Sequence, residues 1–316
     1  MTISLIDGRL DTASAAWIAS EVLHWFSVEP EAIEQIHATR PSYRGWLGML
    51  DGRPVGYASC SLPFSSGDET RTAPSSLFVL RSARHQGVGG ALYRRISSYA
   101  VELGRVELEM IAYADDPDSE GFAAKHGFRV VYRAPSLRLT LAGCPRPDVQ
   151  VPEGLTLSSL AQRPDLDVGV WETACEAFPD IPYDGDTAMQ VGTYEEFTSR
   201  FLAGPRFIPE ATFVAHAGDE VVGYGQLCWM NRAEGVGDHE MLAVRPGWRR
   251  RGVAQALKAA QIAWAIDHGL SEIRTNNEER NAPVRAVNAH FSYARLPDKL
   301  LYRGPCAGAR PRGRYA

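Results

Sequence analysis

Apolar residues in the second half of the chain recur with two different periods, which predicts strands interspersed with helices. Spacing of three or four residues is typical of an amphipathic helix, and strict alternation is typical of a half-buried strand. Helical spacing covers residues 165–178, 193–202, 253–268 and 282–290. Strands are predicted from Leu155, over 211–230 as a hairpin that turns at Gly218 and Asp219, and over 238–244 and 271–275.

The first half has a similar pattern. Helices are predicted over 12–27 and 88–103, and strands over 46–50, 55–60, 75–80 and 105–111. Strands that surround a few helices indicate an α+β (mixed α/β) class.

One strand–turn–helix pattern occurs twice. "LFVLRSARHQGVGGALYRRI", residues 77–96, resembles "MLAVRPGWRRRGVAQALKAA", residues 241–260, and their arginines Arg84 and Arg249 lie 165 residues apart. An internal repeat at about half the chain length predicts two homologous domains. Pro and Gly are frequent over 140–154, so we expect an N-terminal domain at 1–142, a linker at 143–154 and a C-terminal domain at 155–316.

Composition narrows the class of protein. The 316 residues are 45% hydrophobic and 22% charged with a net charge of −5, which is typical of a globular protein and disfavours wholesale nucleic-acid binding. The five cysteines form no C-x-x-C pair, so we expect neither a zinc site nor a disulfide framework, and their scatter suits the cytoplasm. Neither a signal peptide nor a membrane-spanning segment is expected.

The repeated turn has the chemistry of an anion site. The first amides of a helix lack intrahelical partners and attract an anion, and glycine lets a bulky group approach the backbone. Arg249, Arg250, Arg251 and Gly252 stand directly before such a helix, which suits a pyrophosphate. A solvated basic helix start is the alternative, but two matching copies disfavour it. A Walker loop and a dinucleotide fingerprint are both absent.

The residues of this turn resemble a known signature. Arg249-x-x-Gly252-x-Ala254 and Arg84-x-x-Gly87-x-Gly89 resemble the acyl-CoA motif Gln/Arg-x-x-Gly-x-Gly/Ala of the GNAT superfamily of N-acetyltransferases. "TNNEERNAPVRAVNAHFSY" from Thr275 and "EGFAAKHGF" from Glu120 resemble its later segments. The chain therefore resembles tandem-domain members such as mycothiol synthase-like proteins, which implies two GNAT-like domains, each a mostly antiparallel sheet flanked by helices.

The resemblance implies acetyl-CoA as the co-substrate and gives its binding residues. In the second half these are Leu242, Val244, Arg249, Arg250, Arg251, Gly252, Val253, Ala254, Asn281 and Asn288. In the first half they are Arg84, His85, Gln86, Gly87, Val88 and Gly89.

Amine acetylation needs a deprotonated amine and a donor for the developing oxyanion. The resemblance places the base at Asp238 and the oxyanion donor at the N–H of Leu242. Glu240 lies two residues further on and faces the same side of a strand, so it is the second candidate. A polar strand entrance at the surface is the alternative for both carboxylates. His239 points to the opposite face and is expected to be structural.

The first half departs from this pattern at its chemical positions. Ala73 takes the base position, Asp116 the asparagine position and Ala123 the position of a frequent tyrosine acid, so this half is expected to be catalytically silent even if it binds acyl-CoA. In the second half Asn288 takes the tyrosine position. Water or Tyr293 could protonate the leaving thiolate, or the thiolate could leave unaided.

The acceptor is expected to enter at residues 178–197, where Asp180, Tyr183 and Asp184 suit a cationic amine. A solvated acidic loop is the alternative. The sequence predicts an acetyl-CoA-dependent N-acetyltransferase for a small-molecule amine, as monomer or homodimer, with no metal, nucleic-acid or membrane partner. A non-catalytic acyl-CoA-binding or regulatory protein, or acetylation of a protein or peptide amine, are the alternatives.

Overall fold

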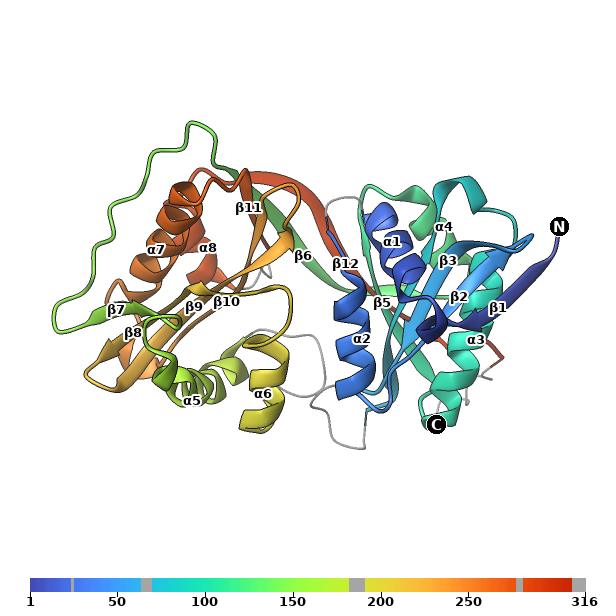
Figure 1. Ribbon diagram of the computed structural model, residues 1–316, viewed down its shortest axis with the longest axis horizontal. Helices are drawn as coiled ribbons and strands as arrows, with labels where there is room; N and C mark the ends of the chain where they lie inside the picture. Colours follow the sequence, from blue (N-terminus) through green and yellow to red (C-terminus); the bar gives the residue numbers. More distant parts are fainter. Residues whose placement is uncertain (24–25, 64–69, 182–190, 277–280, 309–316) are drawn as a thin grey trace, which may run out of the picture. The chain divides into compact units, whose positions relative to one another are not determined.

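The computed structural model describes residues 1–23, 26–63, 70–181, 191–276 and 281–308. The chain divides into two compact units (Figure 1). Unit 1 comprises Met1–Arg133 and Lys299–Ala316, and unit 2 comprises Ala134–Asp298. Each unit is a sheet with helices on both faces, which confirms the predicted mixed α/β class.

Unit 1 has the strand order β1-β2-β3-β4-β5-β12. Strands β1 to β4 pair antiparallel, whereas β4 and β5 pair parallel. The strands are β1 (Ile3–Asp7), β2 (Arg44–Leu50), β3 (Arg53–Cys60), β4 (Thr72–Val79), β5 (Glu107–Tyr113) and the end of β12 (Ala294–Pro305). The helices are α1 (Thr12–Leu23), α2 (Pro30–Thr39), α3 (Val88–Glu102) and α4 (Pro117–Lys125).

Unit 2 repeats this arrangement in the order β6-β11-β10-β9-β8-β7. Its strands are β6 (Arg129–Thr140), β7 (Thr156–Ser159), β8 (Phe207–Ala217), β9 (Glu220–Asn231), β10 (Val236–Val244) and β11 (Glu272–Asn276). Its helices are α5 (Asp167–Ala177), α6 (Tyr194–Phe201), α7 (Val253–Asp267) and α8 (Ala282–Asn288). Strands β7 to β10 pair antiparallel, and β10 and β11 pair parallel.

Helices cover the two faces of the unit 2 sheet with separate cores (Figure 1). On one face α5 and α6 bury Val170, Phe197 and Phe201 with Tyr224 of β9. On the other face α7 buries Leu257, Ile262 and its many alanines, whose small side chains let the helix lie close to the sheet. The helix ends at Asp267, and Gly269 beyond its cap has a φ of +70°, the left-handed conformation expected after a helix C-terminus.

The two halves of the sequence exchange strands. Ser136–Thr140 of β6 pair antiparallel with β11 and complete the unit 2 sheet. The last strand of the chain returns to unit 1, where Lys299–Pro305 pair antiparallel with β5. Leu300 and Tyr302 are buried in the unit 1 core.

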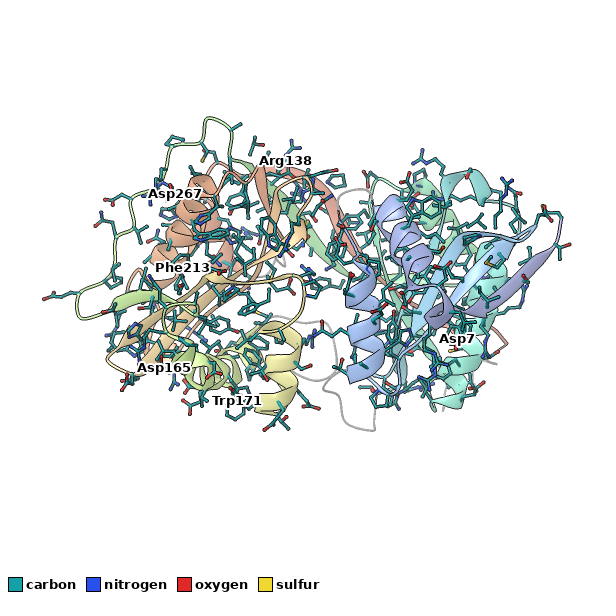
Figure 2. The ribbon with its side chains drawn as sticks, viewed as in Figure 1. Asp7, Arg138, Asp165, Trp171, Phe213 and Asp267 are labelled. Carbon is teal, nitrogen blue, oxygen red and sulfur yellow. The ribbon has the colours of Figure 1, made fainter. Side chains whose placement is uncertain are left out.

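The compact units therefore do not coincide with the boundaries expected at 142 and 155. Residues 143–154 lie within unit 2, where Arg146 forms an ion pair of 2.9 Å with Asp267 near the C-terminal end of α7 (Figure 2). Proline and glycine content indicates irregular backbone, but it carries no information about which sheet the neighbouring strands join.

The strongest periodic patterns match the observed elements. The helices predicted over 88–103 and 253–268 are α3 and α7, and the hairpin at Gly218 and Asp219 joins β8 to β9. The sequence pattern did not predict α2, β1, β6 or β12. Two of these strands, β6 and β12, contain a proline, Pro135 and Pro297, which disfavours a strand prediction.

Candidate active site

The repeated turn of unit 2 connects β10 to α7. Arg250 has a φ of +60° and Gly252, the N-cap of α7, has a φ of +86°. Among the described residues, no side-chain hydrogen bond caps the start of α7, and the atom that a Cβ placed on Gly252 would meet is Pro152 Cγ, at 3.8 Å. The amide donors at this helix start are therefore open to an anion such as a pyrophosphate.

Arg249 braces this turn. Its Nε donates to the carbonyl of Val244 at 3.1 Å, and its terminal nitrogen pairs with Asp180 at 2.6 Å. Arg251 lies over the ring of Trp248. Asp180, predicted to bind the acceptor, is thus an ion-pair partner of the signature arginine, whereas Tyr183 and Asp184 lie outside the described residues.

The turn of unit 1 has the same backbone. His85 and Gly87 have φ values of +61° and +90°, and Arg84 Nε donates to the carbonyl of Val79 at 3.3 Å. Here, however, the guanidinium pairs with Asp116 at 3.1 Å and Asp118 at 2.8 Å. These carboxylates lie at the start of α4 and neutralise the positive charge of Arg84, which would otherwise attract an anion.

The remaining signature positions of unit 1 are spread around this turn. Gln86 donates to the carbonyl of Ser82, Val88 is fully buried, and Gly89 faces Phe122. Ala73 and Ala123, at the base and acid positions, are buried in the apolar core. Unit 1 offers no titratable side chain at these two positions.

Unit 2 brings the two predicted carboxylates together at the middle of β10. Glu240 is the extra residue of a β-bulge, because His239 pairs with Leu227 and Met241 with Gln226. Arg206 contacts both carboxylates, Glu240 at 3.0 Å and Asp238 at 3.4 Å. Their side chains therefore lie close together on one face, as predicted.

The strands β10 and β11 separate at the same level. Their parallel ladder covers Val236–Asp238 and ends at the pair of Asp238 with Arg274, although β10 continues to Val244. Leu242 and Val244 lie beyond this point, packed with Val253 and Leu257 of α7. The orientation of the Leu242 N–H toward an acetyl oxygen stays a prediction.

The two asparagines have different surroundings. The side chain of Asn281 accepts a hydrogen bond from the N–H of Val284 at 3.4 Å and caps α8. Asn288 is 4% exposed, and its amide atoms have no hydrogen-bond partner among the described residues.

Lys258 was missed by the sequence reasoning. Its side chain on α7 is 2% exposed, and burial lowers its pKa to about 7, opposed by the negative charge of Asp238. His239 is also buried and bonds Gln261 at 3.0 Å, and burial, together with Lys258, lowers its pKa well below the usual range. The signal available in the sequence was a lysine on the apolar face of a predicted helix.

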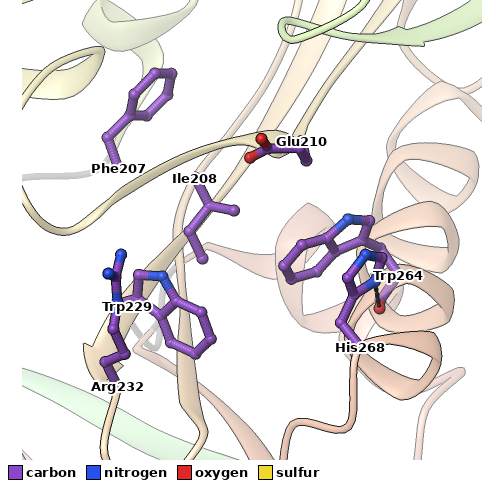
Figure 3. A pocket seen from close by; sticks show the side chains of 7 residues that line it. All are labelled: Phe207, Ile208, Glu210, Trp229, Arg232, Trp264 and His268. Carbon is purple, nitrogen blue, oxygen red and sulfur yellow. Dashed lines mark hydrogen bonds between the residues drawn. The ribbon is translucent and has the colours of Figure 1, made fainter.

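A separate pocket of about 370 Å³ opens near the opposite end of α7 (Figure 3). It is lined by Phe207, Ile208, Glu210, Trp229, Arg232, Trp264 and His268. About 15 residues of helix, or roughly 22 Å, separate His268 from Gly252, so this pocket is distinct from the anion turn.

None of the helices in the described part of the chain is both long and apolar enough to cross a membrane.

Comparisons with known proteins agree with this architecture. A mycothiol acetyltransferase of Geodermatophilus obscurus is 30% identical over 262 residues, which cover 80% of this chain and 79% of that protein. Another, of Catenulispora acidiphila, is 28% identical over 79% of this chain and 76% of that protein.

Solved structures share the whole fold. A tandem GNAT protein from the clavulanic acid biosynthesis pathway superposes with a TM-score of 0.73 at 19% identity, covering 98% of this chain and 100% of that one. A GCN5-related N-acetyltransferase from Sphaerobacter thermophilus has a TM-score of 0.70 at 18% identity and covers 96% of each chain.

The model of the acetyltransferase (GNAT) family matches twice, at residues 12–128 and 172–291, once in each repeat. The chain belongs to the GNAT family and is a tandem-domain N-acetyltransferase.

Proposed function

We propose that unit 2 transfers the acetyl group of acetyl-CoA to the amine of a small molecule. One observation carries this proposal: in unit 2 the open helix start follows the strand that holds the carboxylate pair, β10, whereas unit 1 has Ala73 at the base position. Val244 and Asp238 are six residues apart, about 20 Å along a strand. A pyrophosphate at Gly252 and a thioester near Asp238 would thus lie at the two ends of the diverging part of β10.

The residues of the turn fit the pyrophosphate. Gly252 leaves space and main-chain donors, and Arg250 and Arg251 add positive charge beside a helix start that attracts anions. Acetyl-CoA would supply the activated acyl group, and the chain would hold its phosphates and orient its arm.

Asp238 is the proposed base, with Glu240 as the second candidate. An ammonium has no lone pair, so its proton must leave before or during attack on the acyl carbon. Both carboxylates contact Arg206, and a carboxylate in its ionised form can accept this proton. Their side chains are 13% and 30% exposed, so the more accessible Glu240 could also attract a cationic acceptor.

Unit 1 is proposed to be silent in transfer. Its turn keeps the backbone for an anion, but Asp116 and Asp118 take up the charge of Arg84. An incoming pyrophosphate would have to break these ion pairs and tolerate two carboxylates beside it. Unit 1 is therefore proposed to bind acyl-CoA more weakly than unit 2.

The acceptor is proposed to be a cationic amine, because two carboxylates mark the site. An assay that detects thiol release from acetyl-CoA, run over an aminosugar, a polyamine, amino acid derivatives and the unacetylated precursor of mycothiol, tests this directly. Acetylation of at least one cationic amine is expected, with the product identified by mass. Turnover restricted to peptide or protein amines would contradict the proposed acceptor class.

A further inference from the structure

A group of buried polar side chains in unit 2 has no part in the function proposed above. Lys258 and Gln261 of α7, His239 of β10 and Tyr293, which follows α8, form what we call the amine cluster. His239 Nδ1 lies 3.0 Å from Gln261 Oε1, and Lys258 Nζ lies 5.3 Å from the centre of the Tyr293 ring. Lys258, His239 and Gln261 are 2%, 8% and 1% exposed.

Several atoms of the cluster lack hydrogen-bond partners. Among the described residues these atoms are His239 Nε2, Gln261 Nε2, the Tyr293 hydroxyl and both amide atoms of the neighbouring Asn288. Buried polar atoms are rarely left unpaired, and each unpaired atom reduces stability. Unpaired atoms from several elements lie together here, so we infer that the cluster has a function that offsets the loss of stability.

Unit 1 provides an internal comparison, because it has the same fold without the carboxylate pair. At the offset of 165 residues, the positions of His239, Lys258, Gln261, Asn288 and Tyr293 are taken by Pro74, Tyr93, Ile96, Ala123 and Phe128. Tyr93, which has the one polar side chain there, donates its hydroxyl to the carbonyl of Pro305. Unit 1 thus adopts the same fold without a buried amine at this position. The buried polar residues occur in unit 2, which is also the unit that has the carboxylate pair.

The choice of lysine at this position is also informative. The chain has 33 lysines and arginines, and its lysines are Lys125, Lys258 and Lys299. An arginine stays charged in proteins, whereas a buried lysine can release its proton near neutral pH. Burial lowers the pKa of Lys258 to about 7, so its amine can both give and accept a proton near neutral pH.

The amine lies near the point where β10 and β11 separate. Among the described residues, the charged group that acts on Lys258 is Asp238, the last residue of the parallel ladder, and the neutral His239 and Tyr293 lie around it. The residues of β8 and β9 that pack against α7 include Ala211, Ala215, Val222 and Leu227, which are apolar. Asp238 is thus the charged partner of Lys258 within the described part of the chain.

We propose that Lys258 relays the proton that leaves the acceptor nitrogen to the sulfur of the departing coenzyme A. This inference rests on the proposed function of unit 2. The acceptor nitrogen forms a bond to the acyl carbon, and the carbon–sulfur bond breaks with its electron pair on sulfur. The Lys258 ammonium gives its proton to that thiolate. The proton lost by the nitrogen passes to Asp238 and then restores Lys258, so no other acid or base is consumed.

A direct titration tests the relay without turnover. Protein carrying ¹³C at the lysine ε position gives one resonance for each lysine, assigned through Lys125→Arg and Lys299→Arg. Calorimetry first establishes binding of coenzyme A and of desulfo-coenzyme A, which lacks the sulfur. We expect the Lys258 resonance to titrate near neutral pH, and at higher pH with coenzyme A than with desulfo-coenzyme A, because a thiolate favours the ammonium.

The possible results separate the two proposals. Failure of both ligands to bind overturns the proposed function, and the relay with it. Binding of both ligands with the same Lys258 titration overturns the relay alone. A Lys258 resonance that titrates in the range of the other two lysines also overturns it.

Variants provide the kinetic test. Lys258→Met is expected to lower turnover by about 10²-fold or more, to leave the affinity for acetyl-CoA unchanged and to remove one ionisation from the pH–rate profile. Lys258→Arg keeps the charge but cannot release the proton, so it should not restore turnover. Lys125→Met, on exposed α4 of unit 1, is the control. A folded Lys258→Met or Lys258→Arg enzyme with the wild-type rate and pH profile would overturn the relay.

Discussion

At the scale of single residues, Arg206 links the two candidate bases. Its guanidinium contacts Glu240 at 3.0 Å and Asp238 at 3.4 Å, and its Nε donates to the carbonyl of Trp229 at 2.9 Å. A positive charge between two carboxylates offsets their mutual repulsion, which lets these two side chains lie close together.

Asp238→Asn is expected to lower the acetylation rate by about 10²–10⁴ near neutral pH, because the amide cannot accept the proton. Affinity for acetyl-CoA should be kept. The loss should shrink at high pH, where the free amine forms without help. The measurement is a pH–rate profile together with calorimetry.

Glu240→Gln is the companion variant, because Glu240 contacts the same arginine from the bulge. If both variants keep near-wild-type rates across the pH range, neither carboxylate is the base. Asp180 would then be examined next, since it lies beside the signature turn.

Lys258→Met is expected to raise the free energy of unfolding by roughly 1–3 kcal/mol at pH 7 or below, because it removes a buried polar group. The lowered pKa means that the unfolded chain binds more protons than the folded chain between about 7 and 10.5. Wild-type stability should therefore rise with pH over this range, and the gain from the substitution should shrink.

Urea unfolding at pH 6.5 and pH 9.5 measures this difference. Lys125→Met serves again as the control, since Lys125 is exposed. An equal effect of Lys258→Met at both pH values would show that Lys258 is not titrating in the folded state.

At the scale of elements, the two copies of the strand–turn–helix repeat share their backbone conformation and differ in the charged residues around it. Both turns place a residue with positive φ two positions before a left-handed glycine, and in both the signature arginine donates to the carbonyl of the strand-end valine. The arginine thus stabilises the turn through the same hydrogen bond in both repeats. The difference lies in what surrounds it, two carboxylates of α4 in unit 1 and Asp180 in unit 2.

Gly252→Glu is expected to weaken acetyl-CoA binding by at least about tenfold, because a side chain and a negative charge would occupy the anion site. Gly87→Glu introduces the same charge at nearly the same φ, so it carries the same backbone strain. It should leave turnover largely intact. Calorimetry and the thiol-release assay on both folded variants provide the comparison.

Unchanged acetyl-CoA affinity in Gly252→Glu would contradict the proposed site. Loss of all turnover in Gly87→Glu, with unit 2 still binding acetyl-CoA, would move the reaction to unit 1.

Sequence patterns were sufficient for the elements that repeat. Alternation, helical spacing and glycine placement are local, so β10, the turn at Gly252 and α7 could be predicted from them. The contacts of Arg206 could not be predicted, because Asp238 and Glu240 lie 32 and 34 residues further along the chain. The burial of Lys258 could not be predicted either, because it depends on packing between a helix and a strand. Local periodicity also does not indicate that β6 and β12 pair with strands from the other half of the sequence.

At the scale of the whole chain, the strand exchange makes unit 1 depend on the C-terminus. Lys299–Pro305 pair with β5, and Tyr93 of α3 donates a hydrogen bond to Pro305. Loss of this strand would expose the edge of β5 and the apolar core beneath it.

A chain ended after Asp298 is therefore expected to lose the structure of unit 1 while unit 2 keeps its sheet. Hydrogen exchange followed by mass spectrometry should show loss of protection in β4, β5 and α3. A chain ended after Gly308 keeps all of β12 and is the control. Full protection of unit 1 in the shorter chain would show that the returning strand is dispensable.

The returning strand also has a consequence for biosynthesis. Domains of a nascent chain generally fold in the order in which they leave the ribosome, the N-terminal one first. Here the N-terminal sheet includes Lys299–Pro305, so it cannot be complete until these residues have left the ribosome. Ala134–Asp298, by contrast, are contiguous and can be completed earlier. Until then, the edge of β5 that pairs with Lys299–Pro305 stays unpaired in the N-terminal half. We expect chaperones to bind this incomplete sheet, and we expect a chain that terminates before Lys299 to leave it incomplete.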